Sequence, residues 1–319
     1  MTVLVVGAGV IGSFNAARLA DAGVDVRLLA RGQRLAALRE HGVILQDWRT
    51  GRRSVTPVDL VETIEPAARY DVAVVIVRRN QVASVLAVLA EAPRIPSYVF
   101  LGNNLAGSAD MAAALGGDRV LTGMVNAGGE RDGVVVRYLW TRRLPLLFGE
   151  RDGVTRPRTR AIAEMFCDAG LPARMVTDPE AYQKTHAAGL PAFAGALYSA
   201  DGDIRRLARR PDLLHLVVTG YREALRALQA DGTAIKPVLT RAAMRIPEGV
   251  INAGLRWFFD TELAVVGGQA HALAAADEMR ELANELRAIF RRNGIRSPAN
   301  DRAYAAIDAW VEHQAAGDR

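Results

Sequence analysis

The chain has 319 residues, half of them hydrophobic, and a formal net charge of +5. This length is too great for one ordinary domain and suits two, each able to bury its own core. The basic residues are scattered without interleaved aromatic residues, which argues against nucleic-acid binding. No apolar run has the length of a membrane span and no secretory signal precedes the first one, so we expect a cytoplasmic protein without membrane contacts.

The single cysteine, Cys167, rules out a disulfide framework. It falls in a predicted helix, where a lone thiol is typically a buried packing residue. No metal site is expected.

Short aliphatic segments alternate with helical segments in the first half of the chain. We expect strands over 3–6, 24–29, 71–77 and 97–101, and helices over 11–22, 34–41 and 81–92. The segment 43–58 has the character of an irregular connection. Continuous apolar strands alternating with helices predict a parallel sheet covered on both faces.

The pattern changes after residue 119. Three segments within 119–149 read as strands of an antiparallel extension of the sheet, followed by a helix over 156–170 and a short strand to 176. Beyond Asp178 and Pro179, a typical helix start, the sequence predicts helices over 178–198, 212–231, 238–259 and 271–293, and a terminal helix. The prediction is therefore an α/β Rossmann domain over 1–177 and an all-α domain over 178–319.

A glycine motif lies between the first predicted strand and helix. Gly7, Gly9 and Gly12, with Val10 and Ile11 between the last two, form the pattern G-x-G-x-x-G. The first glycine permits a tight turn, the second lets the backbone approach a pyrophosphate, and the third allows close packing of helix on strand. The helix N-terminus adds free N–H groups and a positive dipole end. These residues predict a dinucleotide site.

The end of the second strand indicates which dinucleotide binds. Sites that prefer NAD usually carry an acidic residue there, whereas this chain has Arg31, with Arg34 nearby. A guanidinium suits a 2′-phosphate and gains little from a hydroxyl, so NADPH is the expected cofactor.

These features, together with four later segments, resemble the ketopantoate reductase (2-dehydropantoate 2-reductase) family over essentially the whole chain. The segments read VRRNQV, LGNNLAG, AYQKTHAAG and ADEMRELANELRAIFRRNGIRSPAN. The resemblance implies a Rossmann domain, an all-helical domain and an active site in the cleft between them. It also implies reduction of a 2-keto acid by NADPH, of the type that converts 2-dehydropantoate to pantoate in pantothenate biosynthesis.

The resemblance assigns roles to individual residues. Arg78 takes the place of a basic residue that helps to hold the cofactor, and Asn103 that of a loop asparagine beside the nicotinamide and the substrate. Lys184 matches the catalytic lysine. Glu278 matches a glutamate that hydrogen-bonds the substrate hydroxyl, although helical periodicity alone suits Glu285 almost as well.

Lys184 is one of only two lysines, the other being Lys236, among 40 basic residues. An ammonium can stabilise the alkoxide that forms during ketone reduction and can give it a proton. Arginine can stabilise the charge but does not give up a proton. The retained lysine therefore fits a general acid, while Lys236 looks like a surface residue.

Two departures concern the substrate. Ala188 replaces a family asparagine, and the stretch 264–269 (AVVGGQ) lacks a family serine that helps to hold the substrate carboxylate. His271, two helical turns before Glu278, is either a surface residue or a further cleft residue. The small-molecule carbonyl substrate is therefore a 2-keto acid or, alternatively, a different ketone or an imine of a specialised pathway. A non-catalytic NADPH-binding sensor is the remaining alternative, and a homodimer is one option for the oligomeric state.

Overall fold

The computed structural model describes residues 1–65, 67–92, 95–125 and 127–317. The chain forms two compact units. The first comprises Met1–Gly102 and Gly107–Glu180, and the second comprises Asn103–Ala106 and Ala181–Arg319. The sequence placed the boundary between residues 177 and 178, whereas the units divide after Glu180, and a four-residue loop of the first half belongs to the second unit.

The first unit is built on an eight-stranded sheet with the order β12-β11-β8-β7-β6-β1-β2-β5. Every neighbouring pair of strands is parallel except β8 and β11. The strands are β1 (Thr2–Val6), β2 (Asp25–Leu29), β5 (Asp59–Val61), β6 (Val72–Val75), β7 (Tyr98–Leu101), β8 (Val120–Met124), β11 (Leu146–Glu150) and β12 (Ala173–Met175).

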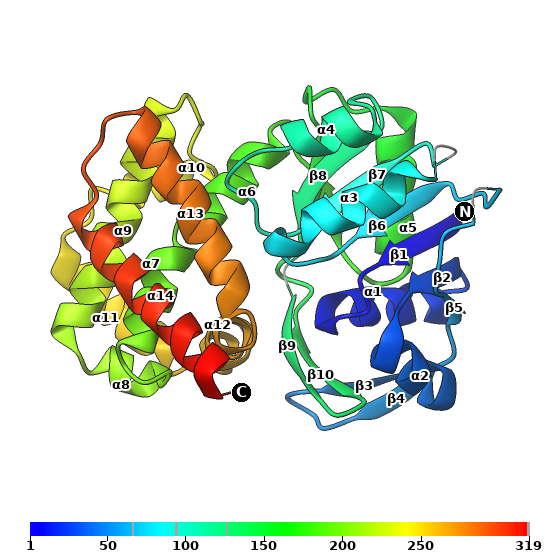
Figure 1. The fold of residues 1–319 in the computed structure, drawn as a ribbon, viewed down its shortest axis with the longest axis horizontal. Helices are drawn as coiled ribbons and strands as arrows, with labels where there is room; N and C mark the ends of the chain where they lie inside the picture. Colours follow the sequence, from blue (N-terminus) through cyan, green and yellow to red (C-terminus); the bar gives the residue numbers. More distant parts are fainter. Residues whose placement is uncertain (66, 93–94, 126, 318–319) are drawn as a thin grey trace. The chain divides into compact units, whose positions relative to one another are not determined.

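Both faces of this sheet are covered by helices. In β1, Val3 and Val5 pack with side chains of α1 and α5, whereas Leu4 and Val6 pack with those of α3 and α4. Figure 1 shows α3 and α4 on the same side of the sheet. The helices are α1 (Val10–Asp21), α2 (Gly32–His41), η1 (Arg79–Gln81), α3 (Val82–Ala90), α4 (Ala109–Leu115) and α5 (Pro157–Asp168). Burial on both faces explains why these strands are continuously apolar.

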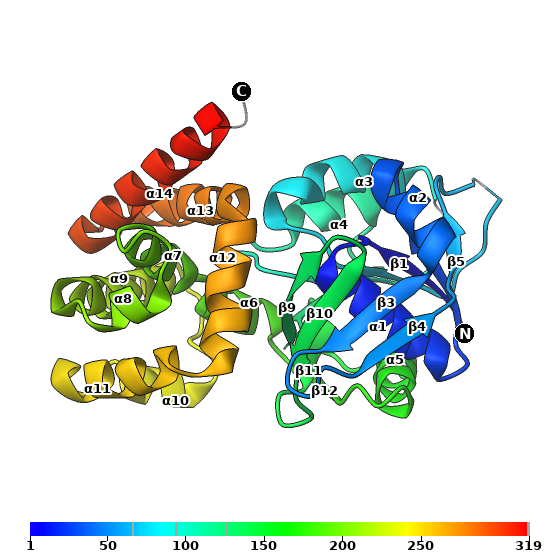
Figure 2. The same cartoon turned by 90° about the horizontal axis from the view of Figure 1, so that it is seen from below.

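A second sheet of four strands packs beside α1, where the ring centroids of Phe14 and Tyr138 are 4.7 Å apart. Its order is β4-β3-β10-β9, and Figure 2 shows it alongside α1. Its strands are β3 (Val43–Asp47), β4 (Arg53–Thr56), β9 (Ala127–Asp132) and β10 (Val135–Trp140).

This second sheet corrects two expectations. The segment 43–58 is not irregular, because it contains β3 and β4. Of the strands expected after residue 119, only β8 and β11 form the antiparallel extension. β10 pairs with β3 and with β9, so β9 and β10 belong to the second sheet instead of the main one. Residue 126, inside the first of the expected strands, lies outside the described residues.

The second unit is helical. Its helices are α6 (Pro179–Ala187), α7 (Leu190–Tyr198), α8 (Ile204–Ala208), α9 (Pro211–Ala230), α10 (Val238–Ala243), α11 (Glu248–Phe259), the π-helical turn η2 (Ala264–Gln269), α12 (Ala270–Ala274), α13 (Ala276–Arg292) and α14 (Pro298–Gly317). Three expected helices are each divided in two, at Gly189, at Pro247 and at Ala275. The helix α14, red in Figure 1, packs on α7, α9 and α13, and Trp310 stacks on Tyr198.

A sheet unit followed by a helical unit confirms the predicted fold class. Cys167 lies in α5 as expected, but it is exposed, so the expectation of a buried packing thiol is wrong. Across the described residues, no helix combines the length and the apolar character that a membrane span requires.

Candidate functional site

The glycine loop has the geometry of a dinucleotide site. A Cβ on Gly7 would lie 2.1 Å from the carbonyl oxygen of Ile76, and one on Gly12 would lie 1.8 Å from the oxygen of Gly7. Both positions therefore exclude any side chain. Gly9, in contrast, has open space where its Cβ would be, and it precedes α1 without a side-chain cap. The backbone at Gly9 and the uncapped N–H groups of α1 can therefore meet a pyrophosphate.

The two arginines after β2 have different positions. Arg31 precedes α2 and is exposed, as the sequence placed it. Arg34 turns back to the glycine loop, where it donates hydrogen bonds to the carbonyl of Ala8 (3.1 Å) and to the hydroxyl of Ser13 (3.0 Å). Arg34 thus braces the loop that would hold a phosphate.

Arg131, in β9, lies near the same loop and was not predicted. Burial lowers the pKa of Arg34, and the charge of Arg131 lowers it further, so the two guanidinium groups repel each other. Nearby, a Cβ on Gly129 would lie 2.8 Å from the side chain of Val10, which places β9 directly against the glycine loop. Within the described residues, no acidic side chain forms an ion pair with Arg131. The sequence did not predict this position of Arg131, because β9 is brought to the glycine loop by strand pairing within the second sheet.

Arg78 follows β6, which is the neighbour of β1 in the sheet. From β1 the chain continues to β2 on one side, and from β6 it continues to β7 on the other side. In sheets of this kind, ligands bind outside the carboxyl ends of the strands at the point where the order reverses. The contact that Gly7 makes with Ile76 shows that the glycine loop and the end of β6 meet there. Arg78 is therefore positioned at the same edge as the glycine loop.

The loop 103–106 is anchored in the helical unit by Glu285 of α13. The carboxylate oxygen Oε2 of Glu285 accepts hydrogen bonds from the backbone N–H groups of Leu105 (2.9 Å) and Ala106 (3.2 Å). Leu105 is fully buried in the core of the helical unit. Asn103 then donates from Nδ2 to Oε1 of Glu278, at 3.4 Å. Helical periodicity could not distinguish these two glutamates, but their contacts differ. Glu285 accepts from the backbone of the loop, and Glu278 accepts from the side chain of Asn103.

Glu278 also faces His271. Its side chain is only 3% exposed, and its Oε2 lies 3.3 Å from Nε2 of His271 in α12. His271 and Glu278 thus face each other although the helix is interrupted at Ala275, between α12 and α13.

Lys184 is half-buried in α6. Hydrogen bonds from Arg292 are the main reason that the pKa of Asp231 is lowered, and the charge of Lys184 also contributes, so the lysine lies within electrostatic range of that carboxylate. His186, two residues on, keeps an exposed surface, but the surrounding protein desolvates its ring. This desolvation lowers its pKa, and the nearby His271 lowers it further. Lys184 thus shares α6 with His186, whose ring interacts electrostatically with His271, the neighbour of Glu278.

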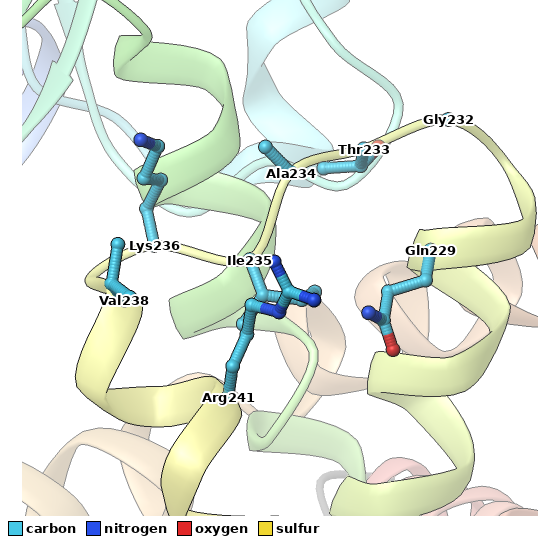
Figure 3. Close-up of a pocket in the computed structure, with 8 residues that line it drawn as sticks. All are labelled: Gln229, Gly232, Thr233, Ala234, Ile235, Lys236, Val238 and Arg241. Carbon is cyan, nitrogen blue, oxygen red and sulfur yellow. The ribbon is translucent and has the colours of Figure 1, made fainter.

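Ala188, one of the positions that depart from the family, is apolar and fully buried, and within the stretch 264–269 the side chains of Ala264 and Val266 are buried. Lys236 is half-buried, and its backbone N–H donates to the hydroxyl of Thr185 (3.1 Å). It borders a cavity of about 300 Å³, which Arg241 also lines. In Figure 3 the amino group of Lys236 points away from Arg241. In the described ranges, no three His, Cys, Asp or Glu side chains are grouped so that they could hold a metal ion.

Residues 3–152 match the family model of the ketopantoate reductase PanE/ApbA. No curated protein matches the chain. Among solved structures, a protein from Ralstonia solanacearum MolK2 assigned to the ketopantoate reductases shares 21% identity over 98% of both chains, with a TM-score of 0.82. The PanE/ApbA family ketopantoate reductase from Ralstonia eutropha JMP134 shares 18% identity over 98% of this chain and 99% of its own (TM-score 0.78).

A D-mandelate dehydrogenase, solved with NADH and anilino(oxo)acetate, shares 15% identity over 97% of both chains, also with a TM-score of 0.78. These likenesses show a common fold. The family model confirms the predicted resemblance for residues 3–152, which match the ketopantoate reductase PanE/ApbA domain.

Proposed function

We propose that this protein reduces the carbonyl group of a 2-keto acid with NADPH, in a reaction of the type that converts 2-dehydropantoate to pantoate. The observation that carries the proposal is the meeting of Asn103 and Glu278 in the helical unit, close to the helix of Lys184. These are the positions that match the site residues of the family.

The proposed cofactor would lie along the glycine loop, with its pyrophosphate at Gly9 and the start of α1. Arg31, exposed at the end of β2, supports a 2′-phosphate and therefore NADPH. Arg131 adds a second cation near the loop, and its repulsion with Arg34 would be relieved by an anion. When bound, NADPH supplies the hydride for the carbonyl carbon.

In this proposal Lys184 acts on the carbonyl oxygen. Its ammonium stabilises the negative charge that develops as the carbonyl is reduced, and transfers a proton from Nζ to that oxygen. Asn103 and Glu278 orient the substrate, Asn103 as a hydrogen-bond donor and Glu278 as an acceptor for a substrate hydroxyl.

A second candidate keeps this chemistry and changes the substrate to another ketone or an imine. It is favoured by Ala188 and by the stretch 264–269, because a site without the family's asparagine and serine holds a polar substrate such as ketopantoate less well. The D-mandelate dehydrogenase of the same fold was solved with an aromatic ligand, anilino(oxo)acetate. A non-catalytic NADPH sensor is the third candidate.

A substrate screen separates these candidates. We would follow NADPH oxidation with ketopantoate, with aliphatic and aromatic 2-keto acids, and with simple ketones and cyclic imines. Turnover of a 2-keto acid supports the main proposal, and turnover of ketones or imines alone supports the second candidate. NADPH binding without turnover of any compound supports a sensor.

Variants of the two lysines test the proton donor. Lys184→Ala should lower kcat by about 10²–10⁴-fold while NADPH still binds, because the general acid is lost. Lys184→Arg should stay slow as well, since arginine keeps the charge but does not donate its proton. Lys236→Ala is the matched control and should retain its kcat. Equal kcat values for Lys184→Ala and Lys236→Ala would contradict the assigned role.

A further inference from the structure

His271 presents a buried nitrogen to a buried carboxylate. Its side chain is 38% exposed, yet its Nε2 atom is covered and lies 3.3 Å from Oε2 of Glu278. Within the part of the chain described, this nitrogen makes no hydrogen bond of good geometry. A buried polar nitrogen without a hydrogen bond is costly, and its presence in a folded protein requires an explanation.

The carboxylate of Glu278 is approached from two sides. Asn103 donates to Oε1 from the loop 103–106, while His271 faces Oε2 from α12. An ionised carboxylate has about four acceptor positions, so two neighbouring donors can fix its plane. Because an ionised carboxylate only accepts, a hydrogen bond between the two side chains requires the proton on Nε2 of His271.

The short helix that carries His271 is held in place next to the histidine. The hydroxyl of Tyr198 donates to the carbonyl of Ala272 (2.6 Å), and Tyr198 itself is stacked on Trp310 with the ring centroids 4.8 Å apart. Just before α12, the side chain of Gln269 accepts from the backbone N–H of Ile204 (2.9 Å). Such anchoring is what a group that must orient another side chain requires.

We propose that His271 is a positioning residue that donates from Nε2 to Glu278 and holds its carboxylate in the orientation that receives the substrate hydroxyl. This inference rests on the proposed function, which gives Glu278 its role in substrate binding. It adds a donor to a site in which Ala188 replaces a family asparagine and the stretch 264–269 lacks a family serine. His271 would thereby restrict the substrates to those that can donate a hydrogen bond to Glu278.

Kinetics of three variants test this role. His271→Leu should raise KM for the best substrate by about 10–100-fold and leave kcat within a few-fold, because a charge-assisted hydrogen bond is lost from a binding group. His271→Gln should recover most of this loss, since its Nε2 can donate from a similar position. In a Glu278→Gln background, His271→Leu should add almost nothing. Additive losses in the double variant, or a Gln variant as impaired as the Leu variant, would overturn the proposal.

His215 provides the matched control. Its Nδ1 lies 2.9 Å from Oε1 of Glu248 on the surface, so His215→Leu also removes a histidine from a glutamate. We expect unchanged KM and kcat for this variant. A KM increase as large as that of His271→Leu would show that the effect is not specific to Glu278.

A stability cycle separates this proposal from the proposed function. The unfolding equilibrium constants of His271→Leu, Glu278→Gln and the double variant should reveal a coupling of about tenfold, with or without turnover. If the wild-type protein turns over no carbonyl compound, the proposed function fails, and the coupling still decides whether His271 holds Glu278. No coupling overturns the proposal in either case.

Discussion

Replacing Glu285 should release the loop that carries Asn103. Glu285 accepts two backbone hydrogen bonds, from Leu105 at 2.9 Å and from Ala106 at 3.2 Å. Hydrogen bonds to a charged group each contribute about 1.5–3 kcal/mol. Since Ala106 is exposed, we count its bond at the low end and expect Glu285→Ala to cost about 3 kcal/mol locally. That corresponds to about 100-fold faster exchange of the two amide hydrogens.

Hydrogen exchange of the Leu105 and Ala106 amides measures this effect directly. Glu285→Gln should show a smaller loss, because its amide oxygen still accepts a neutral hydrogen bond. Glu281→Ala, one turn earlier on α13, serves as the control for any general weakening of that helix. Unchanged protection of both amides in Glu285→Ala would refute the reasoning, because it would mean that core packing of Leu105 alone holds the loop.

Three further predictions concern the cofactor loop and the histidines. Arg31→Asp should raise KM for NADPH by about 10–100-fold and leave KM for NADH unchanged. Arg143→Asp, at an exposed arginine in the turn between β10 and β11, should change neither value. Gly12→Ala should lower Tm markedly, because its Cβ would overlap a backbone oxygen, while Gly9→Ala should fold normally and lose cofactor affinity in calorimetry. Desolvation of the ring by the surrounding protein holds the pKa of His186 below 6.5. The stability that depends on the neutral ring is therefore present above about pH 6.5 and is lost as the pH falls through the folded-state pKa. His186→Gln should flatten this part of the stability–pH curve measured by denaturant unfolding.

The glycine loop could be predicted because its conformation is decided locally. Gly7 and Gly12 have no room for a Cβ beside backbone oxygens of the loop and of β6, and the strand and the helix around them have strong patterns of their own. The same holds for the exposed position of Arg31, two residues after the end of β2. The role of Arg34 could not be read in this way, because its partners, Ala8 and Ser13, are reached only once α2 has packed against the loop.

The helical half shows where sequence periodicity stops being informative. It placed Glu278 and Glu285 on the same side of a helix but could not say that one accepts from a side chain and the other from a backbone loop. That difference depends on Asn103 and Leu105, which are distant in the sequence. The break at Ala275 was also missed, because alanine is a strong helix former and gives no indication of a turn.

Residues 103–106 have a consequence for how the protein is made. Their partner Glu285 is 180 residues further along the chain than Leu105, so a ribosome has released most of the sheet unit long before the partner exists. During that interval the apolar side chain of Leu105 has no helical core to enter. Since the chain crosses between the units after Gly102, after Ala106 and after Glu180, a gene fragment that begins at Ala181 would encode helices without the segment that completes them. The two units therefore differ from a pair of domains that are joined by a single linker. An exchange of either unit between relatives would have to move residues 103–106 together with the helices.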